Sequence, residues 1–201
     1  PGASHSEERM ITPDSQALLL LCSHLGLPSA PEFAPLTLRE WNPLARKLQV
    51  ANLRPGSLLD WSASDLQPRL SLSTDEADRL AHLLERSGAL AIALERLESL
   101  GIRPLTRADS DYPQRYRERL KDSAPPVLFY AGEKVLLGQP GIAVVGSRHL
   151  DEAGQECARF VGNACGLSGQ VLYSGGAKGV DTISMDAALE DRGQGLEVAA
   201  D

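Results

Sequence analysis

Two glycine-bearing segments are the part of this sequence whose residue types and spacing suit anion binding. Gly146-Ser-Arg148 follows one apolar run, and Ser174-Gly-Gly-Ala-Lys-Gly179 follows another further along the chain. Glycines let a backbone approach an anion closely, and the first N–H groups of a following helix are available to bind it. The two segments together predict a phosphate cradle, to which Arg148 and Lys178 bring positive charge.

The elements around these segments are those of a βαβ unit. Ile142–Val145 and Gln170–Tyr173 are predicted buried parallel strands, and Asp151–Gly166 has helical spacing between them. A second helix, Asp181–Glu190, leads to a third strand at Leu196–Ala200. Both glycine segments are therefore expected at the carboxyl edge of the sheet, where ligands bind in open α/β folds. We predict the strand order 3-2-1, which is half of a doubly wound sheet.

Individual residues of the predicted site have simpler alternatives. Arg148 is suited to bind a phosphate bidentately, and a surface pair with Asp151 or Glu152 is its alternative. The Ser147 hydroxyl is a further donor, and Asp181 is expected to cap the helix that it begins. We find no catalytic or metal-binding constellation. The predicted site consists of Gly146, Ser147, Arg148, Ser174, Gly175, Gly176, Ala177, Lys178, Gly179 and Asp181.

The first half of the chain has a different character. Residues 12–100 are predicted to form a small helical domain, preceded by a flexible arm at residues 1–11, and residues 101–201 to form the α/β part. The predicted helices run from Thr12 to Gly26, from Thr37 onward, from Ser73 to about Glu85 with a break at Gly88, and from Ala89 to Leu100. A basic helix, Gln114–Lys121, and a strand, Val127–Tyr130, precede the βαβ unit.

Composition limits the classes of function. The net charge of −7 does not favour nucleic acid over the whole chain, so a polyanion would need a local positive site. No apolar run is long enough to span a membrane, and no basic segment precedes Leu18–Leu21 as in a signal peptide. The three cysteines are expected to be reduced, which favours a cytoplasmic protein.

Four motifs in order resemble the DprA/Smf family of bacterial DNA-processing proteins over roughly residues 100–200. They are Asp111-Tyr-Pro113, Pro126-Val-Leu-Phe-Tyr130 with Gly132, Ile142-Ala-Val-Val-Gly-Ser-Arg148, and Ser174-Gly-Gly-Ala-Lys-Gly-Val-Asp-Thr182. The helical region before them is similar to the family's N-terminal domain, although more weakly. Two features depart from the family: Met185 stands where a histidine is usual, and the chain ends before the rest of the sheet.

The resemblance implies a Rossmann-like, DprA-type domain that binds single-stranded DNA through its backbone, without a cofactor and without catalysis. Both glycine segments would line the DNA pocket. The implied role is recombination mediation in DNA uptake or transformation, as in competence, with a recombinase as a protein partner. The resemblance also implies a homodimer for the full-length protein.

A nucleotide-binding or phosphoribosyl-cleaving protein of the related superfamily is the alternative. Residues 142–201 carry four Lys or Arg against nine Asp or Glu, which opposes strong nucleic-acid binding by this segment alone. Against the enzyme, the loop Ser174–Asp181 lacks the catalytic glutamate that such enzymes carry. A dinucleotide dehydrogenase is a third interpretation, but the glycine fingerprint it needs is absent after Val145.

The strand Ile142–Val145 is expected to form an edge of this half-sheet. Only Val127–Tyr130, a partner chain or a bound helix would cover its backbone groups. We therefore expect the chain to pair this edge with another copy, or to be less soluble and to bind DNA more weakly than a longer protein.

Overall fold

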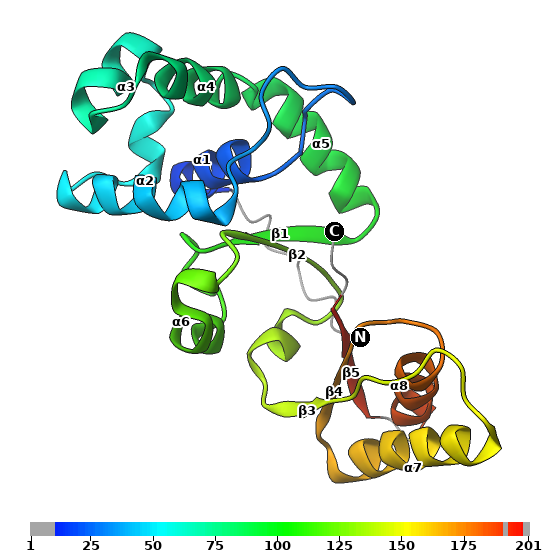
Figure 1. Ribbon diagram of the computed structural model, residues 1–201. Coiled ribbons are helices and arrows are strands. Elements are labelled where there is room, and N and C mark those ends of the chain that lie inside the picture. Colours follow the sequence, from blue (N-terminus) through cyan, green and yellow to red (C-terminus); the bar gives the residue numbers. More distant parts are fainter. Residues whose placement is uncertain (1–10, 191–192, 199–201) are drawn as a thin grey trace, which may run out of the picture. The chain divides into compact units, whose positions relative to one another are not determined.

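A computed structural model describes residues 11–190 and 193–198, and the predicted arm at residues 1–10 lies outside them. The chain forms two compact units, Pro1–Gly132 and Glu133–Asp201 (Figure 1). The division falls later than the change near residue 100 that the sequence suggests, because two strands of the intervening segment pair with each other. Among the described residues, no helix has the length and apolarity needed to cross a membrane.

The first unit is built mainly from helices that pack around one buried helix. Its helices are α1 (Pro13–Cys22), α2 (Leu38–Val50), the 3₁₀ turn η1 (Pro55–Leu58), α3 (Ala63–Leu70), α4 (Thr74–Leu84) and α5 (Ser87–Ser99). Residues 17–21 of α1 are all buried, which is expected of a helix that is apolar on every side and surrounded by others. Capping boxes begin α2 at Thr37 and α4 at Ser73, as the sequence predicts.

Two helix boundaries differ from the prediction, and one helix was not predicted. α1 ends at Cys22, because the Ser23 hydroxyl and N–H both bond the Leu19 carbonyl and its backbone is extended. Gly26 lies in the following turn instead of ending the helix. α5 begins at Ser87, so Gly88 lies in its first turn and does not separate it further from α4. The helix α3 was not predicted, although Ser62 and Asp65 form a capping box at its start.

The end of the first unit is a two-stranded antiparallel ribbon. β1 (Ile102–Thr106) pairs with β2 (Val127–Ala131), and α6 (Gln114–Leu120) with the turn η2 (Lys121–Ser123) connects them. The predicted strand is thus confirmed, and within the described chain its partner is β1. The Tyr112 hydroxyl donates to the Pro125 carbonyl at 2.8 Å, and burial raises the pKa of Tyr112 to about 12. Tyr112 therefore ties the first part of the β1–β2 connection to its last part.

Asp109 attaches this ribbon to α1. Its carboxylate is buried and accepts from the Ser15 hydroxyl at 2.7 Å and from the Thr106 N–H and hydroxyl at 2.6 and 3.0 Å. Arg117 donates to the Asp109 carbonyl at 2.7 Å and lies over the Tyr112 ring. Arg117, part of the basic run in α6, is thus engaged in holding the fold.

The second unit is a parallel sheet with two helices packed on it. After the turn η3 (Lys134–Gly138), β3 (Gly141–Ala143), β4 (Val171–Ser174) and β5 (Gln194–Glu197) lie in the order β3-β4-β5. α7 (Glu152–Ser168) and α8 (Val180–Glu190) connect them. This confirms the predicted βαβ unit and its strand order; residues 199–200 of the predicted third strand lie outside the described residues. Among those described, β3 has a strand on one side only.

Both helices cover the same face of this sheet. Leu172 of β4 packs with Cys165 of α7 and Ala188 of α8 in one apolar cluster, with Met185 against it. Figure 1 shows α7 and α8 side by side, and a Cβ on Gly162 would lie 2.2 Å from the Ser184 carbonyl oxygen. The helices therefore pack closely only because residue 162 is glycine. Met185 is partly buried and packs against this cluster.

Candidate phosphate-binding site

The two glycine segments lie in contact at the carboxyl ends of β3 and β4. The Val180 N–H donates to the Ser147 carbonyl at 3.1 Å. Gly179 has a φ of +92°, and a Cβ there would lie 2.2 Å from the same carbonyl oxygen. A Cβ on Gly146 would lie 2.5 Å from a methyl carbon of Val180. Glycine at these two positions is what lets the loops approach so closely.

Asp181 holds the two loops together. Its carboxylate is buried, with one oxygen accepting from the Gly146 N–H and the other from the Gly175 N–H, each at 3.2 Å. The predicted role as helix cap is wrong, because α8 already begins at Val180 and the side chain reaches back between the loops. Two of the N–H groups expected to bind an anion are therefore satisfied within the protein.

The remaining backbone donors of the second loop are those of residues 176–179. Within the described chain, the backbone N–H groups of residues 176–179 have no acceptor at hydrogen-bond distance. They stand at the start of α8, whose dipole favours an anion there. Lys178 is exposed beside them, and Arg148 is exposed on the neighbouring loop. This part of the site is suited to hold a phosphate group.

Two serines of the predicted site have other roles. The Ser147 hydroxyl donates to the His149 carbonyl at 2.6 Å and accepts from the His149 N–H, so its proton is directed within its own turn. Ser174 is the last residue of β4 and is 4% exposed. Its hydroxyl has no partner among the described residues, and its carbonyl accepts from the Val198 N–H. The Ser147 proton is thus used within its own turn, and the Ser174 hydroxyl is buried.

Glu197 is a further residue of the site and was not among those predicted from the sequence. It ends β5 at the same edge of the sheet, and a Cβ on Gly176 would lie 2.0 Å from one of its carboxylate oxygens. The signal was available, because the carboxyl end of a third parallel strand lies beside the other two. The site thus combines the positive charges of Arg148 and Lys178 with a negative charge against the glycine loop.

The described side chains do not form a cluster suited to bind a metal ion. Among residues 11–190 and 193–198, no group of three or more His, Cys, Asp or Glu side chains is placed to hold a metal ion. The acidic residues nearest the loops, Asp181 and Glu197, act on backbone groups and on the field of the site.

Comparison with known proteins relates about half of the chain, from the end of the first unit through the second, to a known family. Residues 103–201 match the family model described as DNA recombination-mediator protein A. The protein Smf of Synechocystis sp. is 35% identical over 98 residues, covering 47% of this chain and 24% of that protein. DNA processing protein DprA of Streptococcus pneumoniae is 42% identical over 76 residues, covering 37% of this chain and 26% of that protein. The matches thus span about a quarter of each relative's length.

A solved structure extends the likeness to the fold of nearly the whole chain. The X-ray structure of DNA processing protein A from Streptococcus pneumoniae aligns with a TM-score of 0.59 and 24% identity. The alignment covers 95% of this chain and 58% of that one. The motifs, the family model and the two relatives agree that residues 103–201 of this chain form a domain of the DprA/Smf family.

Proposed function

We propose that the two glycine loops bind the backbone of single-stranded DNA. We further propose that the chain acts in DNA recombination as a mediator protein. The observation that carries the proposal is the row of backbone N–H groups at residues 176–179, left without internal acceptors beside Lys178 and Arg148. Such donors bind phosphate without reading bases. The description of the matched family as a recombination mediator supports DNA as the polyanion and a recombinase as the protein that receives it.

The same arrangement supports binding without catalysis. Among the described residues, Asp181 is the carboxylate buried between the loops, and it already accepts two backbone N–H groups. An acid or base catalyst must reach the proton that it transfers, and this side chain is directed into the protein. Turnover of a nucleoside monophosphate that Asp181→Asn abolishes would contradict this proposal and favour the phosphoribosyl-cleaving alternative.

The test is a titration of labelled oligo-dT against the whole chain at several salt concentrations, with free nucleotides as competitors. If the loops bind the DNA backbone, the affinity for oligo-dT should fall steeply as the salt concentration rises, and mononucleotides should compete only weakly with oligo-dT. A nucleotide-binding protein would show the reverse, with tight mononucleotide binding and little preference for a longer strand. Homodimerisation of a longer protein would add a second binding surface and remains a prediction.

Arg148→Ala is expected to weaken single-stranded DNA binding about tenfold, equally for all sequences, because a charge-assisted contact to phosphate is lost. The slope of log affinity against log salt should become shallower by about 0.7, the value for one phosphate contact on a single strand. Arg159→Ala is the matched control, since Arg159 is an exposed arginine of α7 in the same unit. Equal effects of the two substitutions would remove Arg148 from the site.

Glu197→Gln is expected to strengthen DNA binding, by about threefold at low salt. The carboxylate lies against Gly176, where it repels an incoming phosphate by an amount on the order of 1 kcal/mol in water. Anisotropy titrations at 20 mM and 200 mM salt, roughly bracketing strong and weak screening, should show the gain fading at high salt. Glu190→Gln, at the exposed end of α8, removes the same charge away from the loops. An equal gain in that control would mean that only net charge matters.

A further inference from the structure

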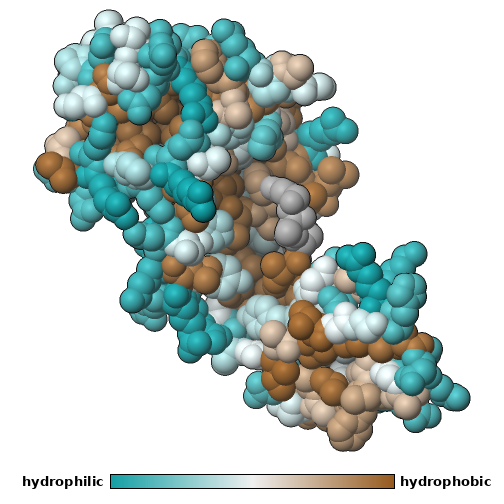
Figure 2. Space-filling model, in the orientation of Figure 1, coloured by the Kyte–Doolittle hydropathy of each residue, from teal (hydrophilic) through white to brown (hydrophobic). Residues whose placement is uncertain are grey.

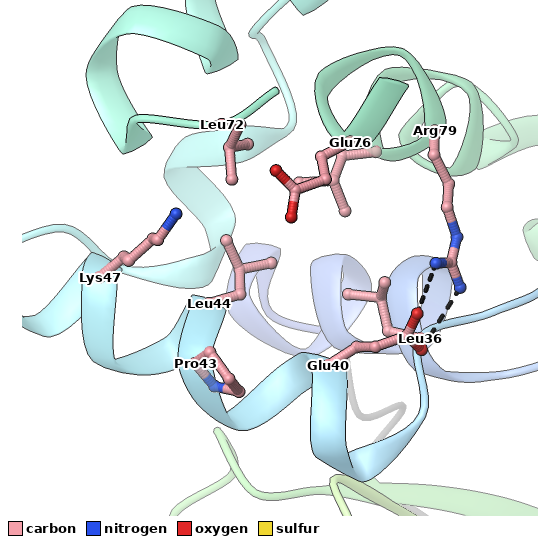
Figure 3. Close-up of a pocket in the computed structure, with 9 residues that line it drawn as sticks. Leu36, Glu40, Pro43, Leu44, Lys47, Leu72, Glu76 and Arg79 are labelled. Carbon is pink, nitrogen blue, oxygen red and sulfur yellow. Dashed lines mark hydrogen bonds and ion pairs between the residues drawn. The ribbon is translucent and has the colours of Figure 1, made fainter. Parts of the chain in front are cut away.

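A pocket in the first unit lies between α2 and the α3–α4 region, and the proposed DNA site does not involve it. Its volume is about 190 Å³. Figure 2 shows hydrophobic surface recessed among hydrophilic side chains over this part of the unit. Leu36, Leu44 and Leu80 form its buried floor, and Leu72 and Pro43 stand on its walls (Figure 3). The interior is therefore suited to an apolar group.

Four charged side chains surround this floor, and each is fixed by the protein. Arg79 donates to the Glu40 carboxylate at 2.6 Å and to the Ala34 carbonyl at 2.9 Å. Lys47 donates to the Ser71 carbonyl at 3.0 Å. Because these side chains are already ordered, a ligand would not have to immobilise them. The rim carries two positive and two negative charges, so it does not select an anion.

Glu76 provides the one directed hydrogen-bond acceptor. Its Oε2 accepts from the Ser73 N–H at 2.8 Å and from the Ser73 hydroxyl at 3.0 Å, which completes the capping box. Its Oε1 has no partner within the part of the chain that the structure describes. Figure 3 shows the carboxylate directed into the space enclosed by the lining residues. The Ser73 N–H lowers the pKa of Glu76, so the carboxylate remains an acceptor at neutral pH.

Size and chemistry together identify an occupant. An enclosed apolar cavity of about 150 Å³ accommodates benzene, and this pocket, which is open to solvent, has room at about 190 Å³ for a two-ring group. Lys47 and Arg79 stand on opposite sides, where they favour the electron-rich face of an aromatic ring. An indole alone among side chains combines two rings with a single N–H donor. We propose that this pocket binds the indole of a tryptophan presented by a partner protein.

The tryptophans within residues 1–201 do not fill this pocket, because both are engaged elsewhere. The chain has two, at positions 41 and 61. Trp41 is 4% exposed in the core, and Trp61 lies under the Arg69 guanidinium at 4.7 Å. A second copy of this chain would present the same two engaged side chains. A tryptophan anchor surrounded by a charged rim is a common arrangement at protein interfaces.

The test uses N-acetyl-tryptophanamide as the probe and follows amide resonances of the whole labelled chain by NMR. Saturable shifts confined to residues around the pocket are expected. The 1-methylindole analogue, which lacks the N–H donor, should bind about fivefold more weakly, because the Glu76 oxygen would be desolvated without a partner. Absence of saturable shifts at the pocket would overturn the proposal. Equal binding of the two probes would overturn the assignment of the indole donor to Glu76.

A blocking variant separates the pocket from the rest of the surface. Pro43→Trp places an indole at the rim of the pocket and removes a proline from within α2, so the fold should be retained. It is expected to abolish probe binding. Val50→Trp is the control, on the same helix at a position that is 89% exposed and outside the pocket lining. Probe binding that survives Pro43→Trp would show that the ligand sits elsewhere.

Discussion

Gly179→Ala is expected to reduce single-stranded DNA binding by more than about tenfold. The φ of +92° is strained for any residue with a Cβ, and that Cβ would lie 2.2 Å from the Ser147 carbonyl oxygen. Because the obstacle is backbone, the two loops must separate, and the Val180 N–H loses its bond to Ser147. Anisotropy titration with oligo-dT measures the loss, and hydrogen exchange of the two loops should show them loosened.

Gly169→Ala is the matched control for this result. Gly169 also has a positive φ, of +67°, at the end of α7, but nothing lies within 4 Å of an added Cβ. It should carry a backbone penalty of about 1 kcal/mol and leave DNA affinity unchanged. If both substitutions weakened DNA binding alike, close approach of the loops would not be needed for the site.

Asp109→Ala is expected to lower the free energy of unfolding of the first unit by about 3 to 5 kcal/mol. The substitution leaves the Thr106 N–H and hydroxyl and the Ser15 hydroxyl buried without their acceptor. Urea unfolding followed by tryptophan fluorescence isolates this unit, because both tryptophans, Trp41 and Trp61, belong to it. DNA binding by the glycine loops should be less affected than stability.

Asp109→Asn should be intermediate, since one amide oxygen replaces two carboxylate oxygens as acceptor. Asp75→Ala serves as the surface control, because Asp75 is an exposed residue in the first turn of α4. A change below about 1 kcal/mol for Asp109→Ala would mean that water replaces the carboxylate and that Asp109 does not fasten the ribbon to α1.

The second unit could be predicted from the sequence almost element by element. β3 and β4 belong to short apolar runs that lead into glycine turns, and α7 has an N-cap at Asp151 and a glycine C-cap. Such signals are local, so they can be read without a structure. The partner of β2 could not be found in this way, because Pro104 makes the 102–106 segment an unconvincing strand and pairing depends on residues far apart in the chain.

Part of the candidate site could also be predicted from the sequence, because its signals are local. The glycine loops are contiguous in sequence, and their place at the strand ends follows from the parallel arrangement. The role of Asp181 was predicted wrongly, because its carboxylate bonds Gly146 and Gly175 on two loops that come together only in the folded chain. Glu197 was missed because its contact with Gly176 depends on where the third strand ends. Side-chain direction was the information that the sequence lacked.

The Asp181 carboxylate also bears on how fast a ligand is captured. It joins the ends of β3 and β4 before any phosphate arrives, so the loops need no closing motion after contact. Encounter should then be governed by diffusion and by the local field of Arg148 and Lys178. In stopped flow, DNA association should therefore follow a single phase whose rate rises in proportion to DNA concentration. Added salt should lower the association rate constant by a larger factor than it raises the dissociation rate constant.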